Sequence, residues 1–180
     1  MEGSVAHNMD QGETHDRNTE NILNGSWTLW AHLPHDTDWS IKSYKKIDDF
    51  NSVEAAVTLT ETLPHKMIKN CMLFLMREGI APTWEDPKNR AGGSFSYKVT
   101  NKIVPHIWRD LTYNLVGETL GTSNNIQGNI NGITISPKKN FCVIKVWMAS
   151  CSSQDPNIIH QIGDGIVSHG CLFKKHNPEY

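Results

Sequence analysis

Residues 130–148 read INGITISPKKNFCVIKVWM and contain the pattern that decides the fold. Two runs rich in β-branched and aromatic residues, Ile130 to Ile135 and Phe141 to Met148, lie on either side of the turn-forming segment Ser136 to Asn140. Such a pair of runs around a short segment with Pro and Asn predicts two antiparallel strands joined by a hairpin turn. The hairpin indicates that the sheet is mostly antiparallel.

Further strands and helices are predicted on the N-terminal side of this hairpin. Strands are expected at residues 26–32 (SWTLWAH), 71–76 (CMLFLM) and 94–99 (SFSYKV), where Phe95, Tyr97 and Val99 alternate onto one face. A helix from about Pro105 to Thr119 is indicated because Trp108, Leu111 and Leu115 fall on one apolar stripe. The pattern predicts an α+β fold with helices on one face of a curved sheet.

Two more helices are expected near sequence signals for helix ends. Ser52 is a suitable N-cap for a helix that ends before Pro64. A last helix is predicted after Pro156, although the glycines at 163, 165 and 170 interrupt its pattern.

Length and composition indicate one domain and restrict the function. With 180 residues, we expect a disordered polar arm at 1–20 and a single domain at 21–180. The formal net charge of −2 excludes a general basic nucleic-acid binder, because such proteins bind by neutralising many phosphates. No signal-peptide core or membrane-spanning run occurs, and Glu2 excludes N-myristoylation, so a cytoplasmic protein without a membrane partner is expected. The four cysteines lack zinc-site spacing, so neither a metal nor another cofactor is expected.

Residues 79–93, GIAPTWEDPKNRAGG, form the candidate binding loop. Trp84 has two interpretations, since it either packs inward or offers an exposed ring face for a ligand. Glu85 beside it favours a ligand, because a purine needs a surface on which to stack and an acceptor for its Watson–Crick edge.

This loop, with five tryptophans in matching order around it, resembles the cap-binding proteins of the eukaryotic translation initiation factor 4E family. The chain is similar to a divergent member over roughly Ile22 to Ile166. The residues that carry the resemblance are Trp27, Trp30, Asp38-Trp39, GIAPTWEDPKN with Gly92-Gly93, Trp108, Val116-Gly117-Glu118 and Trp147. The resemblance implies helices on the convex face of the sheet and a slot for the 7-methylguanosine cap of mRNA on the concave face.

The same resemblance implies roles for four residues of the slot. Trp39 and Trp84 would sandwich the methylated base, whose positive charge adds cation–π attraction to stacking. Glu85 would accept hydrogen bonds from the base edge, and Trp147 would line the wall beside the N7 methyl group.

Cations for the cap triphosphate are expected in the turn of the 130–148 hairpin. Lys138 and Lys139 are the candidates, and their alternative is a solvated hairpin tip. Ser94 stands where the family often has a basic residue, so Lys174 and Lys175 in the tail are further candidates.

The convex face departs from the family pattern. Relatives hold a scaffold of the factor 4G type or a 4E-binding regulator there and place an exposed Trp on the first helix, where this chain has Val57. Arg109 and Tyr113 stand where aliphatic residues are common. Either the face has lost its partner or it is reshaped for another, and we favour the second because Tyr and Arg are frequent at interface hot spots.

Two functions remain for a monomer of this family: a translation initiation factor, or a cap-binding repressor that recruits no scaffold. A third class, an enzyme acting on the cap, is not expected, because neither a carboxylate-rich metal motif nor a clustered histidine nucleophile is present. The region after Trp147 has Gly163-Asp164-Gly165 where the family continues a basic helix, so the C-terminal part of the domain is expected to be shortened.

Overall fold

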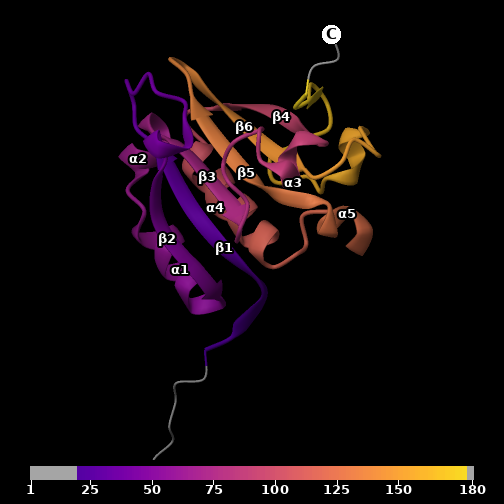
Figure 1. Cartoon of the computed structure of the whole chain (residues 1–180), viewed down its shortest axis with the longest axis horizontal. Coiled ribbons are helices and arrows are strands. Elements are labelled where there is room, and N and C mark those ends of the chain that lie inside the picture. The colour runs from indigo at the N-terminus through magenta and orange to yellow at the C-terminus, as the bar shows by residue number, and fades with distance from the viewer. Residues whose placement is uncertain (1–19, 178–180) are drawn as a thin grey trace, which may run out of the picture.

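The computed structural model describes residues 20–177 and contains one antiparallel sheet, with strand order β2-β1-β3-β5-β6-β4-β7 (Figure 1). The strands are β1 (Ile22–His32), β2 (Lys45–Ser52), β3 (Met72–Arg77), β4 (Gly93–Thr100), β5 (Ile130–Pro137), β6 (Phe141–Met148) and β7 (Leu172–Lys175). The helices are α1 (Val53–Thr62), α2 (His65–Asn70), α3 (Pro87–Arg90), α4 (Val104–Val116) and α5 (Asn124–Gly128), with short 3-10 turns η1 (Ile41–Ser43) and η2 (Pro156–Ile158). Apart from Glu20, the predicted disordered arm lies outside the described residues.

The predicted hairpin is confirmed and lies inside the sheet. β5 and β6 pair antiparallel, with Thr134 opposite Lys145 and Gly132 opposite Trp147. β3 pairs with the other edge of β5, and there the backbone comes very close to Gly132. A Cβ added at Gly132 would lie 2.4 Å from the carbonyl oxygen of Leu75, so only glycine fits this crossing.

Helices α1, α2 and α4 cover one face of the sheet and enclose the main core. Ser52 caps α1 as predicted, since its side chain accepts a hydrogen bond from the backbone N–H of Ala55. The predicted stripe of Trp108, Leu111 and Leu115 is buried in α4, which ends at Val116, a little earlier than expected. The α+β fold with a curved sheet is therefore confirmed.

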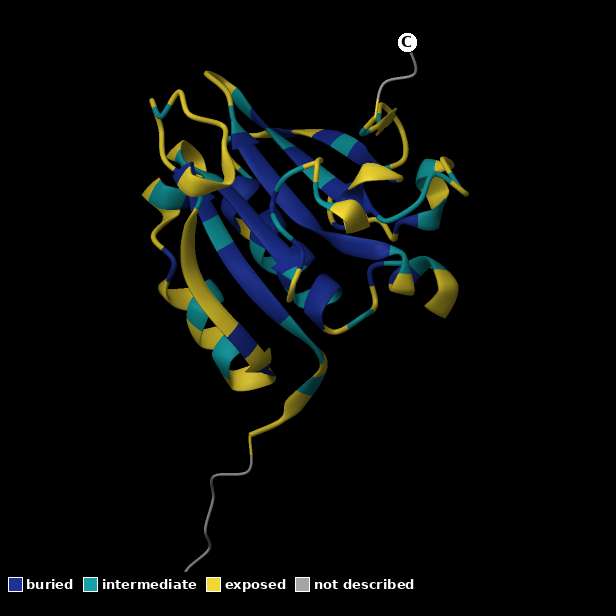
Figure 2. Cartoon of the chain, in the orientation of Figure 1, coloured by how far each residue is buried: buried dark blue, intermediate teal, exposed yellow. Residues whose placement is uncertain are grey.

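The opposite face of the sheet carries a smaller cluster, which we call the concave cluster. It consists of Phe74, Met76, Ile80 and Trp147, with Trp30, Tyr44 and Met72 packed against it. Figure 2 shows that the central strands are buried, whereas the edge strand β2 is exposed along most of its length. The loop that carries α3 reaches this face through Ile80.

The prediction of a helix after Pro156 is wrong. Only the turn η2 forms there, with Asp155 accepting a hydrogen bond from the backbone N–H of Asn157, and the following residues make isolated bridges. The chain then adds β7 to the edge of the sheet, beside β4. β2, β7, α2, α3 and α5 were not predicted.

Candidate functional site

Strand register places an indole and two lysines on the concave side of the sheet. Trp147 of β6 pairs with Ser94 of β4, and Ser94 pairs in turn with Lys174 of β7. Directly paired residues share a face of a sheet, and so do residues two apart on one strand. Lys145 therefore shares the face of Trp147, while the small side chain of Ser94 leaves room between Trp147 and Lys174.

These side chains line a hollow of about 240 Å³, which we call the basic hollow; its lining comprises Trp84, Ser94, Lys145, Trp147, Lys174, Lys175 and His176. Burial lowers the pKa of Lys145, and the nearby charges of Lys174 and Lys138 lower it further. A partly buried lysine whose pKa is lowered by neighbouring positive charges marks a site that a bound anion would stabilise.

The loop between β3 and β4 is held by one buried side chain, that of Asn89. Its Nδ2 donates hydrogen bonds to the carbonyl oxygens of Ala81 (3.0 Å) and Thr83 (2.8 Å), and its Oδ1 accepts one from Nδ2 of Asn131 (2.9 Å). Asp86 tightens the same turn, because its carboxylate accepts hydrogen bonds from the backbone N–H groups of Ala81 and Lys88. The loop is therefore fixed from inside.

This fixed loop presents Trp84 and Glu85 outward. Trp84 keeps 42% of its surface exposed while it lines the basic hollow, so inward packing is not its role. Glu85 is also exposed, and its backbone oxygen accepts a hydrogen bond from Arg90. Burial raises the pKa of Tyr44, and the Glu85 carboxylate raises it further. The Glu85 carboxylate is therefore close enough for its charge to act on Tyr44.

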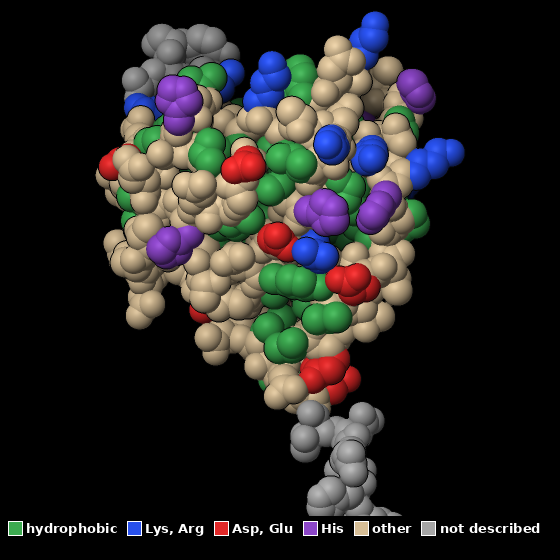
Figure 3. Space-filling view, turned by 180° about the vertical axis from the view of Figure 1, so that it is seen from behind, with side chains coloured by type: hydrophobic (Ala, Val, Ile, Leu, Met, Phe, Trp, Pro, Cys, Tyr) green, Lys and Arg blue, Asp and Glu red, His purple; other side chains and the backbone are tan. Residues whose placement is uncertain are grey.

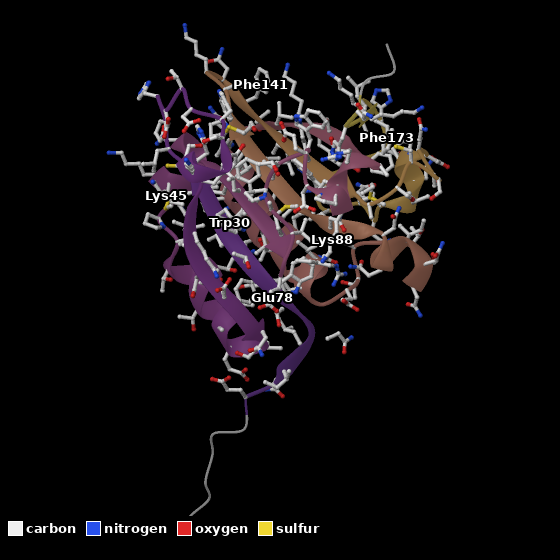
Figure 4. The ribbon with its side chains drawn as sticks, viewed as in Figure 1. Trp30, Lys45, Glu78, Lys88, Phe141 and Phe173 are labelled. Carbon is white, nitrogen blue, oxygen red and sulfur yellow. The ribbon has the colours of Figure 1, made fainter. Side chains whose placement is uncertain are left out.

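Trp39 lies in the connection between β1 and β2 and is linked to the same Tyr44 through His32. Its indole is 57% exposed and stacks on the ring of His32, with 4.2 Å between ring centroids and 3° between planes. His32 contacts Tyr44 edge to face, and Tyr44 contacts Phe74 of the concave cluster in the same way. Figure 4 labels Trp30 on β1 and Phe173 on β7, which lie toward opposite edges of the sheet.

The structure thus brings most of the predicted base-binding residues to one face. Trp84 and Trp147 line the same hollow, the charge of Glu85 acts on Tyr44, and the Tyr44 ring contacts the His32 ring that stacks on Trp39. Within residues 20–177, the rings of Trp39 and Trp84 make no stacking contact with each other. Their role in holding a base stays a prediction.

Of the predicted phosphate candidates, the two lysines of the tail, Lys174 and Lys175, line the basic hollow, whereas the two of the hairpin turn do not. Lys138 and Lys139 occupy the exposed turn between β5 and β6 and do not line the basic hollow, although Lys138 is close enough to influence Lys145. Lys145 was not among the residues predicted to bind phosphate. The available signal was its position two residues before Trp147, which puts both side chains on one face of a strand.

His176 closes the basic hollow at the end of the described chain. Its ring lies 4.6 Å from that of Trp147, and its Nδ1 is 2.8 Å from the carbonyl oxygen of Asn89, to which it donates a hydrogen bond. Burial lowers the pKa of His176, an effect that the neighbouring Lys145 reinforces. The tail is thereby tied to the loop that carries Trp84.

The convex face has an apolar hollow of its own, about 180 Å³ in volume. Val57 and Tyr113 both line it, together with Leu23, Val53, Ala56, Val116 and Gly117. Arg109 lies outside this hollow and borders a second, more polar one. Figure 3 shows hydrophobic side chains gathered over this lower part of the helical face, with acidic groups around them.

No helix within residues 20–177 is long and apolar enough to cross a membrane. No group of three or more His, Cys, Asp or Glu side chains that could hold a metal ion occurs in that part of the chain.

Comparisons with known proteins agree on one family. The family model described as "Eukaryotic initiation factor 4E" matches residues 22–178. The chain is 29% identical over 150 residues to "Eukaryotic translation initiation factor 4E-2" of Schizosaccharomyces pombe, and 32% identical over 138 residues to "Eukaryotic translation initiation factor NCBP" of Oryza sativa subsp. japonica. These matches cover 78% and 76% of this chain, which spans only 58% of the length of either relative.

Solved structures share the fold. A complex of C. elegans eIF4E-3 with the 4E-binding protein Mextli and a cap analog superposes with a TM-score of 0.67 at 24% identity, covering 74% of this chain and 77% of that one. Schistosome eIF4E complexed with m7GpppG and 4E-BP gives a TM-score of 0.65 at 25% identity, covering 73% of each chain. Because the family model spans nearly all of the described residues, this chain belongs to the eukaryotic initiation factor 4E family.

Proposed function

We propose that this protein binds the 7-methylguanosine cap of mRNA and acts in translation initiation. Its relatives in S. pombe and rice carry the name of translation initiation factors, and the schistosome relative was solved with m7GpppG. The single observation that supports the proposal most is the exposed pair Trp84 and Glu85, held on a fixed loop beside Trp147 and the lysines of the basic hollow.

The base is proposed to lie between Trp39 and Trp84. N7 methylation gives guanine a delocalised positive charge, and two indoles hold such a ring by stacking and by cation–π attraction, about 2 kcal/mol each when water is excluded. Glu85 would accept hydrogen bonds from the N1–H and N2 amine of guanine and would also balance its charge. Trp147 would contact the methyl side of the ring.

The triphosphate is proposed to occupy the basic hollow. Lys145 and Lys174 would meet the phosphates nearest the base, and Lys138 and Lys139 on the hairpin turn would extend the positive region outward. Because the whole chain has a net charge of −2, this local cluster accounts for anion binding that overall charge would not favour.

The first experiment is a fluorescence titration with 7-methyl-GTP and with GTP. Stacking of the base on two indoles should quench tryptophan emission, and the methylated ligand should bind much more tightly. Glu85→Gln should weaken 7-methyl-GTP binding by about tenfold to a hundredfold, since a hydrogen bond to a charged group contributes about 1.5–3 kcal/mol.

The matched control is Glu78→Gln. Glu78 begins the same loop but lies toward the opposite end of the sheet from Phe173 and the basic hollow (Figure 4), so this variant should bind as the parent does. Equal affinity of the parent for GTP and 7-methyl-GTP would contradict the proposed function.

The phosphate assignment has a separate test. Lys145→Met and Lys174→Met should weaken 7-methyl-GTP binding but leave binding of 7-methylguanosine, which lacks phosphates, unchanged. Lys102→Met, at an exposed lysine outside the hollow, is the control. A loss shared by the nucleoside would show that the lysines act on the base or on folding instead.

The convex hollow is proposed to hold a protein partner, either a 4G-type scaffold or a 4E-binding regulator. The C. elegans relative was solved with a 4E-binding protein, and here Val57 and Tyr113 line one apolar hollow. Capture by a 4G-type peptide that is lost on Val57→Asp but unaffected by Tyr113→Ala would contradict a reshaped face.

The second candidate function is that of a cap-binding repressor. It is favoured by Val57 and Tyr113, because a protein whose convex face no longer fits the usual scaffold would occupy the cap without recruiting that scaffold. Translation of a capped reporter in a depleted extract separates the two functions: an initiation factor restores synthesis when added back, whereas a repressor lowers it.

The remaining expectations are proposals of the same kind. We place the protein in the cytoplasm, acting as a monomer that binds without catalysing a reaction. Residues 21–180 would form a single cap-binding domain with a shortened C-terminal region. An intact cap analogue after long incubation with the protein and Mg²⁺ would support the absence of catalysis.

A further inference from the structure

The imidazole of His32 lies directly beneath the exposed indole of Trp39. The two rings are nearly parallel, 3° apart, with a centroid distance of 4.2 Å. His32 itself is only 2% exposed, because it belongs to β1 and packs against the edge of Tyr44. One face of the Trp39 indole is thus covered by a buried ring that the sheet holds in place.

His32 also holds the backbone just before Trp39. Its Nε2 lies 2.8 Å from the carbonyl oxygen of Asp38, and a carbonyl only accepts, so Nε2–H is the donor. The Asp38 carboxylate accepts hydrogen bonds from the backbone N–H (2.8 Å) and hydroxyl (2.9 Å) of Ser40. The residues before and after Trp39 are therefore fixed through Asp38, and the indole is fixed through the stack.

We propose that His32 is the positioning residue that holds Trp39 ready for the cap, and that the charge of His32 controls how strongly Trp39 grips a cationic base. This inference rests on the proposed function of Trp39 as one wall of the slot.

The effect of the His32 charge on cap binding follows from the contact between the His32 and Trp39 rings. A neutral imidazole leaves the π-electrons of Trp39 available to the methylated guanine on its other face. A protonated imidazole is itself a cation over the same indole, so it competes with the base for those electrons and repels its charge. The groups that face His32 are the Asp38 carboxylate in its own loop and the Tyr44 phenol of the neighbouring segment, with Glu85 beyond that phenol.

The first test needs no ligand. Tryptophan emission of the free protein is followed from pH 8 to pH 5. A protonated ring stacked on an indole quenches its emission, so the parent should lose intensity. In a His176→Gln background, which removes the other histidine ring in contact with an indole, His32→Phe and Trp39→Phe should both abolish this loss. His106→Gln, at an exposed histidine on α4, should keep it.

The second test measures 7-methyl-GTP affinity at pH 7.5. His32→Ala removes the stack and the hydrogen bond and should weaken binding about tenfold, from the usual contributions of an aromatic pair and one hydrogen bond. His32→Phe keeps the stack and should restore most of the affinity. In a Trp39→Ala background, His32→Ala should have no further effect, because His32 acts through Trp39.

The pH profile separates positioning from a merely structural role. Affinity of the parent for 7-methyl-GTP should fall between pH 7.5 and pH 5.5 more than that of His32→Phe. Parent-like affinity in His32→Ala, or an acid quench that survives in His32→Phe, would overturn the inference. If the parent bound no cap analogue, the proposed function would fail. Loss of the acid quench in His32→Phe and in Trp39→Phe would still show that the charge of His32 acts on the Trp39 indole.

Discussion

Replacing Asn89 by Ala should release the loop that carries Trp84 and Glu85. The side chain of Asn89 is fully buried and makes three hydrogen bonds, at 3.0, 2.8 and 2.9 Å, to Ala81, Thr83 and Asn131. A hydrogen bond of this kind contributes about 1 kcal/mol net, so the variant should lose about 3 kcal/mol of unfolding free energy.

The loss is measurable by thermal and urea unfolding. For a domain of this size, 1 kcal/mol shifts Tm by about 2–4 °C, so Asn89→Ala should melt about 6–12 °C lower. Below that transition, 7-methyl-GTP affinity should also fall, because the loop no longer holds Trp84 and Glu85 in place. Asn125→Ala, at an exposed asparagine of α5, should stay within about 0.5 kcal/mol of the parent.

The exchange Asn89→Asp sharpens the test. It keeps the acceptor for Asn131 but turns the donor into an oxygen that faces the carbonyl oxygens of Ala81 and Thr83. Because Asn89→Asp buries a carboxylate here, this variant should be less stable than Asn89→Ala at neutral pH. Its stability should recover partly in acid, where the protonated carboxyl group can donate a hydrogen bond again. A loss below about 1 kcal/mol in Asn89→Ala, or equal stability of the two variants at pH 7, would refute the reasoning.

Three further predictions concern stability. Gly132→Ala should force β3 away from β5 and lower stability by about 1–3 kcal/mol in urea unfolding, since the added Cβ would lie 2.4 Å from the Leu75 carbonyl oxygen; a neutral effect would contradict the close crossing. Leu111→Ala should cost about 2–5 kcal/mol through a cavity in the main core, and unchanged Tm would show that α4 packs differently. Burial lowers the pKa of His176 in the folded protein, so the unfolded chain binds a proton at this residue more readily, and the free energy of unfolding should fall as pH drops below about 6.5. His176→Gln should reduce this pH dependence. An unchanged slope of unfolding free energy against pH would contradict the buried environment of His176.

Local patterns predicted much of the fold because burial on one face imposes a period on the sequence. The stripe of α4 and the alternation of Phe95, Tyr97 and Val99 follow directly from that constraint, and both were confirmed. β2 escaped prediction because an exposed edge strand such as KKIDDFNS needs no apolar alternation. β7 has four residues, too few for a pattern, and the glycine-rich segment before it gives no strand signal.

The candidate site divides in the same way. The pair Trp84 and Glu85 was visible in the sequence because an exposed loop had no structural need for an indole. Lys174 became part of the basic hollow only through the pairing of β7 with β4, which brings together segments far apart in the chain. The contact of His32 with Trp39 likewise depends on how the connection after β1 folds back on that strand.

The sequence by itself determined the hairpin of residues 130–148, the main helix, the binding-loop motif and hence the family expectation. Each of these follows from interactions between neighbours in the chain, which leave a readable pattern. The tertiary structure alone decided which lysines line the basic hollow, which ring stacks on Trp39, and that Asn89 holds the loop between β3 and β4. These depend on strand register and burial between distant segments, where one residue of displacement would turn a side chain to the other face.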